Sequence, residues 1–309
     1  MIKKQSQRKE KADMLREAML FSLTRSSWSN RAHVDKNVLT GNATNESVNV
    51  TKRLLKSPDL KNINDFLGEI YVWCLSRAVP STAIRNGIYF VKQDQVKAFE
   101  AKLSSAQKYL MDTLVPEFLS TYDDARRAAQ KPASEGGLGD LFNEKDYPDP
   151  EELESSFGLN WSWLALSVPD ELPEEVRERE CAKLQESYDT ARGEITLALR
   201  VAFQELVKHA ADRLTPDADG KGKIFRAGSM LENFENFFET FSARNLLEDA
   251  DLEKVVNQAR AIISGVPDAD ALRADESLQH TVGESFKAVA KTLDSLVERA
   301  KVRKFDFSV

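Results

Sequence analysis

The sequence predicts a mainly α-helical fold, an elongated antiparallel helical bundle around two long helices, to which a small antiparallel β-ribbon can be added. Apolar residues recur at steps of three and four from Gln95 to Ala129, and the same spacing returns from Glu174 to Leu214. Such spacing places each set along one face of an α-helix. We therefore expect two long helices that pair antiparallel over most of their length.

The composition is that of a soluble protein, with 30% charged and 41% hydrophobic residues among 309. No stretch approaches the roughly 18 apolar residues of a membrane span, and the first residues lack the apolar core of a secretory signal. We therefore expect a cytoplasmic protein with no membrane partner. The formal net charge of −7 argues against nucleic-acid binding over the whole surface, although it leaves a local basic patch open.

Three shorter helices are expected before the first long one. Gln5–Leu23 has apolar residues at helical spacing, and a loop or short strand around Trp28 follows it. The second helix begins at a capping residue, position 44 or 45, and runs through Leu55. The third, Leu60–Ala78, has its apolar residues on one face.

Pro116 falls inside the first long helix. Proline removes one backbone hydrogen bond and clashes with the carbonyl four residues earlier, that of Asp112. We expect a kink between Asp112 and Pro116, because the apolar stripe continues in phase on both sides. The glycine-rich segment Lys131–Asp140 should end the helix and be mobile.

Two short segments favour strands. Gly87–Val91 is an apolar β-prone run, and Leu159–Val168 begins with alternating tryptophans. If both are strands, they can pair as an antiparallel ribbon. Between the long helices, Tyr147–Pro150 opens a short acidic helix that reaches Phe157.

Helical spacing returns in the C-terminal part, in Ala227–Phe241, Asp249–Ser264 and Asp275–Ala300. The chain then divides into N-terminal helices with the first long helix, an acidic and aromatic irregular insertion, and the second long helix with the C-terminal helices. These parts are residues 1–130, 131–173 and 174–309, and the first and third are expected to form one continuous fold.

No constellation of residues indicates catalysis, so we predict no catalytic residue, no cofactor and no metal ligand, and a protein that is not an enzyme. Phosphate-loop, dinucleotide-binding and nucleophile-elbow motifs do not occur. Cys74 and Cys181 lie within helical apolar patterns and are interpreted as small buried hydrophobes. The histidines, the acidic residues from 140 to 154 and the Asp217–Gly220 turn are more readily explained as surface groups than as ion ligands.

Two sets of residues are candidates for binding. The aromatic face of the 227–241 helix is interpreted first as core and second as a subunit interface, which an apolar tail would extend. The interface candidates are Phe234, Phe237, Phe238, Phe241, Phe305 and Phe307. A basic N-terminus followed by an isolated tryptophan suits single-stranded nucleic acid. These candidates are Lys3, Lys4, Arg8, Lys9, Lys11, Arg16, Arg25, Trp28 and Arg31.

Four segments, taken in order and spacing, resemble a family of helical proteins of unknown function encoded by bacteriophages and conjugative elements. They are SWSNRAHVDK, VPSTAIRNGIYFV, Asp146-Tyr147-Pro148 followed by Phe157, and the long segment that begins FRAGSMLENFENFF. The resemblance covers residues from about 14 to 300. It implies a mobile-element protein of the bacterial cytoplasm, encoded near genes for DNA metabolism, and it carries over no reaction and no catalytic residue.

Two functions from different classes follow. The first is a non-catalytic protein that acts through association, either as a homo-oligomer or with a phage or host protein, because a basic N-terminus and an acidic middle permit contacts between subunits. The alternative is a single-stranded DNA-binding or annealing accessory protein that uses the basic N-terminal helix.

Overall fold

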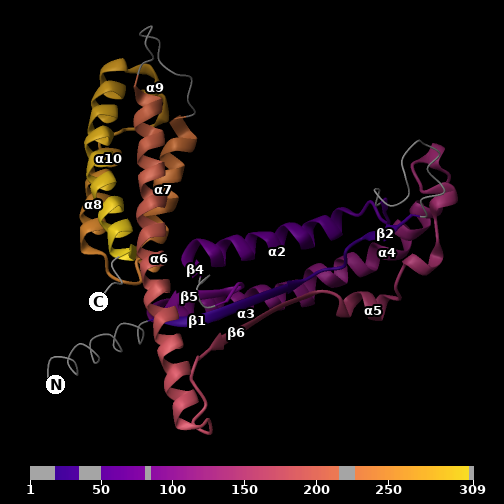
Figure 1. The fold of residues 1–309 in the computed structure, drawn as a ribbon. Coiled ribbons are helices and arrows are strands. Elements are labelled where there is room, and N and C mark those ends of the chain that lie inside the picture. The colour runs from indigo at the N-terminus through magenta and orange to yellow at the C-terminus, as the bar shows by residue number, and fades with distance from the viewer. Residues whose placement is uncertain (1–17, 35–49, 81–84, 216–226, 306–309) are drawn as a thin grey trace, which may run out of the picture. The chain divides into compact units, whose positions relative to one another are not determined.

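The computed structural model describes residues 18–34, 50–80, 85–215 and 227–305, and it is mainly α with a small antiparallel sheet, as predicted (Figure 1). The strands are β1 (Ala18–Ser26), β2 (Arg31–His33), β3 (Thr51–Arg53), β4 (Val79–Pro80), β5 (Ile88–Lys92) and β6 (Gly158–Leu164). The α-helices are α2 (Pro58–Arg77), α3 (Val96–Tyr109), α4 (Val115–Gln130), α5 (Pro150–Ser155), α6 (Glu174–Leu214), α7 (Ala227–Arg244), α8 (Ala250–Ser264), α9 (Ala269–Ala274) and α10 (Glu276–Phe305).

The chain forms two compact units, and each is built from separate stretches of sequence. Unit 1 comprises Met1–Ser22, Leu75–Val96 and Trp163–Val309, and unit 2 comprises Leu23–Cys74 and Lys97–Ser162. This division crosses the three sequence segments outlined above, because chain that is distant in sequence is brought together in each unit.

In unit 1, α6 pairs antiparallel with α10. Arg200 donates a hydrogen bond to Leu296 O, and Gln204 donates one to the Asp294 carboxylate. Residue numbers therefore rise along α6 in the direction in which they fall along α10. Near the far end a Cβ on Gly283 would lie 3.2 Å from the Cβ of Leu214, so glycine lets the helices approach closely there. The core is completed by α7, α8 and α9. The bundle therefore surrounds two long helices.

The partner of α6 differs from the prediction. The stretch from Gln95 to Ala129 belongs to unit 2, apart from its first two residues, whereas α6 belongs to unit 1 and packs on α10. Periodic apolar residues identify a face that must be buried, but they do not identify which of several similar faces covers it.

The helical run from 93 to 130 has its distortion where Pro116 predicts it. A 3₁₀ turn (Gln93–Gln95) leads into α3, and a π-helical turn (Leu110–Leu114) separates α3 from α4. The wider turn lies directly before the proline, which cannot donate to the carbonyl of Asp112. Phe99, Leu110 and Phe118 are all fully buried, so the apolar stripe stays in phase across it.

The four-stranded sheet has the order β4-β5-β1-β6, and β1 pairs antiparallel with β5. The prediction of a helix over Gln5–Leu23 is therefore wrong from Ala18 onward, and residues 5–17 lie outside the described part. Leu20 and Phe21 are adjacent and both buried. A strand with neighbours on both edges and both faces partly covered does not alternate, so its apolar run cannot be distinguished from a buried helix by period alone.

The two predicted strands exist, but they do not form a ribbon with each other. Gly87–Val91 corresponds to β5, and the first part of Leu159–Val168 to β6, which ends at Leu164. In the sheet β1 lies between them. The prediction failed because β1 was assigned to a helix. The predicted helix through Leu55 is also wrong within the described residues, because Thr51–Arg53 forms β3 and pairs with β2. Its candidate caps at 44 and 45 lie outside them.

The glycine-rich segment after α4 ends the helix, as predicted, and adopts a defined turn. Leu138 N–H donates to Ala129 O at 2.8 Å and Gly139 N–H to Lys131 O at 3.0 Å, so the segment folds back over the helix end. Gly136 has φ of +84°. A Cβ on Gly137 would lie 2.0 Å from Lys131 O, which only glycine avoids.

Candidate functional site

The nucleic-acid candidates are only partly described. Six of them, Lys3, Lys4, Arg8, Lys9, Lys11 and Arg16, lie outside the described residues. Trp28 is half-buried and meets Tyr122 edge to face at 6.2 Å, so its ring serves the packing of unit 2. The Arg25 guanidinium lies 4.5 Å from the Tyr71 ring centroid. Arg31 is exposed on the β2–β3 hairpin.

The aromatic face of α7 is core, as its first interpretation predicted. Phe234, Phe237 and Phe241 are buried, and Phe234 stacks on Phe286 with centroids 4.9 Å apart. These three side chains are therefore unavailable as a subunit interface, which corrects that minority interpretation. Phe238 is half-buried beneath the Arg260 guanidinium. The Phe305 side chain and all of Phe307 lie outside the description.

The Asp146-Tyr147-Pro148 element is tied by hydrogen bonds to the residue that follows β3 and to α4. The Tyr147 hydroxyl donates to Leu54 O at 3.1 Å, and the Tyr122 hydroxyl donates to Pro148 O at 2.9 Å. Burial raises the pKa of both tyrosines to about 12. Each hydroxyl therefore stays protonated as a donor, which suits structural anchoring and not proton abstraction.

Two acidic residues of this region are paired with cations. Asp146 Oδ2 lies 2.6 Å from Lys52 Nζ, and Glu144 forms an ion pair with Arg126. Across the described ranges, no three His, Cys, Asp or Glu side chains gather closely enough to hold a metal ion. Asp217–Gly220 falls outside those ranges.

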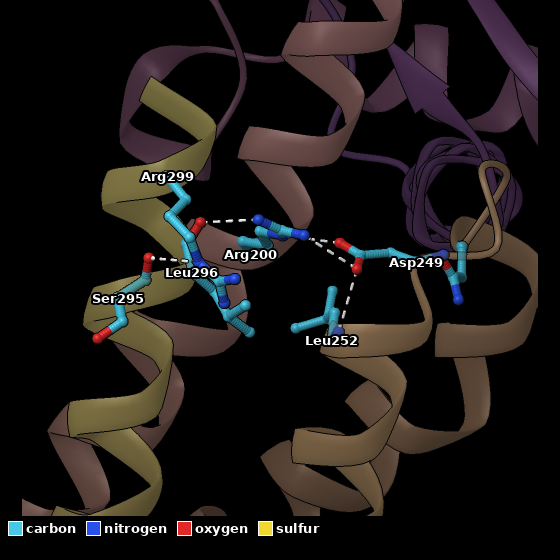
Figure 2. A network of polar contacts seen from close by, with 7 residues as sticks. Arg200, Asp249, Leu252, Ser295, Leu296 and Arg299 are labelled. Atoms are coloured by element: carbon cyan, nitrogen blue, oxygen red, sulfur yellow. Dashed lines mark hydrogen bonds and ion pairs between the residues drawn. The ribbon is translucent and has the colours of Figure 1, made fainter. Parts of the chain in front are cut away.

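The most enclosed ionic network joins three helices of unit 1 (Figure 2). Arg200 on α6 donates from Nε to Asp249 Oδ2 at 2.7 Å and from Nη1 to Leu296 O at 2.7 Å. Asp249 also caps α8, because its Oδ1 accepts from Leu252 N–H at 3.1 Å. Burial alone would raise the pKa of Asp249, but these hydrogen bonds hold it below its ordinary value. Both oxygens of the carboxylate accept hydrogen bonds, so the network holds α6, α8 and α10 together.

The two cysteines differ. Cys74 is buried, as predicted, whereas Cys181 is exposed on α6, which corrects the prediction for that residue. Cys181 lies in the first half of α6, where none of residues 174–190 is buried, while nine residues from Ala191 to Leu214 are. Figure 1 shows this half extending beyond the ends of α7, α8 and α10. This half carries an apolar stripe in which no side chain is fully buried, although Tyr188 packs against a small core.

A groove of about 550 Å³ lies between this half of α6 and the segment that leads into it. Its lining mixes apolar and charged side chains. It comprises Val168, Asp170, Arg177, Glu178, Cys181, Leu184, Gln185 and Tyr188. We call it the α6 groove. At one end of the groove Tyr188 packs against a small core, against which Ala18 of β1 also packs. This burial raises the pKa of the Tyr188 hydroxyl.

The α6 groove lies in a strongly acidic stretch. Residues 170–190 contain eight Asp and Glu against three Lys and Arg. Some charges compensate locally, since Glu180 pairs with Lys183 at 2.8 Å and with Arg179 at 3.1 Å. The excess is negative, so the groove suits a cationic partner. The sequence signal available for it was the stripe of Leu184 and Tyr188, which periodicity alone assigned to the bundle core.

No family model, no curated protein and no solved structure matches this chain. The α-helices of the described residues also include none that is both long and apolar enough to cross a membrane.

Proposed function

We propose that this protein is non-catalytic and acts through self-association, in which the α6 groove of one subunit receives the basic N-terminal segment of a second copy. The uncovered first half of α6 carries the proposal. Helices in water gain most of their stability from packing of an apolar face, so a stretch of 17 helical residues with no fully buried side chain calls for a partner.

Charge supports the choice of occupant. Residues 3–16 contain six Lys and Arg against two acidic residues, opposite in sign to residues 170–190. They directly precede β1, whose Ala18 packs on the same small core as Tyr188. An exchange of this segment between two copies would therefore bring it to the α6 groove without a long linker.

The resemblance of four segments to a mobile-element family supports a role in a bacterial host carrying such an element. The resemblance implies no chemical reaction, and a protein that acts by presenting helical surfaces to a partner requires none.

The experiment measures molar mass and the reactivity of Cys181 together. The full chain is examined by light scattering at low and high salt across a range of protein concentrations, with a thiol reagent as the probe of the groove. We expect an oligomer at low salt that dissociates at high salt. Cys181, which lines the groove, should be protected from the reagent as concentration rises, while Cys74 is buried throughout.

Two variants on the same helix provide the matched comparison. Glu178→Lys reverses a charge in the groove and should weaken association, whereas Glu205→Lys makes the same change at an exposed position in the second half of α6 and should not. Deletion of residues 3–16 should give a monomer with fast Cys181 labelling. A monomer at both salt concentrations would refute self-association, as would protection that does not depend on protein concentration, because that pattern indicates docking on the same subunit.

A further inference from the structure

The β2–β3 hairpin places two arginines directly opposite each other. Arg31 pairs with Arg53 in the antiparallel register. The next pair along the ladder is hydrogen-bonded, because Leu54 N–H donates to Asn30 O at 3.1 Å. Hydrogen-bonded and non-hydrogen-bonded pairs alternate, so the arginines form a non-hydrogen-bonded pair, in which side chains approach most closely.

Two more polar side chains share this face. His33 lies opposite Thr51, two residues from the arginine pair on each strand, and side chains two apart point to the same side. All four residues are exposed, whereas Ala32 and Lys52 between them are half-buried. The arginine face, as we name it, consists of Arg31, His33, Thr51 and Arg53.

The back of the hairpin is fixed to unit 2. The Lys52 ammonium donates to Leu141 O and lies 2.6 Å from Asp146 Oδ2. At the open end of the hairpin, before β2 and after β3, the Asn30 amide makes two hydrogen bonds to Leu55: its Nδ2 donates to Leu55 O at 2.9 Å, and its Oδ1 accepts from Leu55 N–H at 2.7 Å. The arginine face is therefore held in place on unit 2.

The paired arginines are not neutralised within the described part of the chain. Neither guanidinium has a carboxylate at ion-pair distance there, although other exposed cations of the same unit, such as Lys61 and Arg127, do. Like charges directly opposite destabilise a strand pair. An anion bound between the two guanidinium groups would attract both of them and offset their mutual repulsion.

A small pocket adjoins the arginine face at Arg53. It has a volume of about 100 Å³, and its floor is mostly apolar. Its lining is Arg53, Leu54, Lys56, Ala125, Ala128, Ala129, Gly136, Gly137 and Leu138. The Lys56 ammonium donates one hydrogen bond to Gly136 O at 2.9 Å, which leaves two of its protons for a ligand.

We propose that this surface binds the phosphate group of a nucleotide, either free or in a single strand of nucleic acid, with the apolar part of the nucleotide against the pocket. Two guanidinium forks, an imidazole and a hydroxyl offer more donors than a carboxylate can accept, whereas the oxygens of a phosphate can use both forks. The proposal is independent of self-association, because its residues all lie in unit 2 and the α6 groove lies in unit 1.

The test titrates the full chain with three probes: inorganic phosphate, a nucleoside monophosphate and a short fluorescent oligothymidylate. Arg31→Gln and Arg53→Gln should each weaken binding about tenfold, the effect of losing one charge-assisted contact. With the oligonucleotide, each substitution should also lower the slope of log affinity against log salt by about 0.7. Lys102→Gln, an exposed lysine on α3, removes the same charge from the same unit and is the control.

Thermal unfolding, measured with and without phosphate, shows whether a variant that fails to bind is still folded. Without ligand, Arg53→Gln should be at least as stable as the natural protein at low salt, because the repulsion is removed, and phosphate should stabilise the natural protein more than this variant. Binding of the monophosphate as tight as that of the oligonucleotide would identify a free nucleotide as ligand, and binding of the oligonucleotide alone would identify a strand. The proposal fails if no probe binds, or if the variant that carries both Arg31→Gln and Arg53→Gln binds as well as the Lys102→Gln control.

Discussion

Arg200 and Asp249 form a two-hydrogen-bond ion pair that joins α6 to the N-cap of α8, with N–O distances of 2.7 and 3.0 Å. Both side chains are 11% exposed. Because Arg200 also reaches Leu296 O on α10, the pair fixes three helices of unit 1 at one level.

Removing one partner of this pair should destabilise unit 1. Arg200→Met leaves the Asp249 carboxylate buried without its counter-charge, and such losses cost about 3–5 kcal/mol. Urea denaturation followed by circular dichroism would measure the change. Arg273→Gln, which breaks the more exposed pair with Asp270, should leave the unfolding curve close to that of the natural protein.

The same carboxylate predicts a dependence of stability on pH. The pKa of Asp249 is lower in the folded protein than its ordinary value of about 4, so the unfolded state binds the proton more readily. The stabilisation is present above the unfolded pKa and is lost as pH falls through the folded pKa. Denaturation curves from neutral pH down into the acid range should therefore show a fall in stability that is smaller in Asp249→Asn, which starts less stable. Equal acid dependence in both proteins would contradict this assignment.

Two glycine substitutions should act in opposite directions. Gly137→Ala places a Cβ 2.0 Å from Lys131 O, so the turn after α4 must shift, at a cost of roughly 1–3 kcal/mol. Gly193→Ala lies inside α6 with nothing within 4 Å of the added Cβ. It should stabilise the helix by about 0.5–1 kcal/mol. Melting temperatures of the two variants, compared with the natural protein, check both signs.

The core position of the α7 aromatics can be separated from a role in association. Phe234 is fully buried against Phe286, so Phe234→Ala should cost about 3–5 kcal/mol and leave the molar mass of the folded protein unchanged. Phe238→Ala removes a half-buried ring and should cost less. A variant at Phe234 that stayed fully stable while losing oligomeric mass would contradict the assignment to the core.

Local periodicity predicted much of the helical content. The face of α2 that carries Leu60, Ile63 and Leu67 was identified from spacing and is buried. The position of the distortion before Pro116 and the extent of α6 also followed from the sequence. These features depend on residues within a few turns of one another, and such neighbours are visible in a linear sequence.

The candidate sites were less predictable because they depend on distant pairing. Arg31 was a candidate from sequence, but Arg53, His33 and Thr51 were not, since they join it only when β3 pairs with β2. The α6 groove was missed for the opposite reason. Leu184 and Tyr188 have the spacing of core residues, and nothing local shows that their part of the helix extends past its own bundle.

The sequence by itself determined a mainly α chain, the faces that its helices bury and the aromatic core of α7. The tertiary structure decided that Ala18–Ser26 is a strand, that α6 packs on α10, and that two arginines from separate segments lie opposite each other. The physical reason is that backbone propensity and apolar spacing are short-range, whereas the choice of a packing partner depends on the fit of whole surfaces that the chain assembles only when folded.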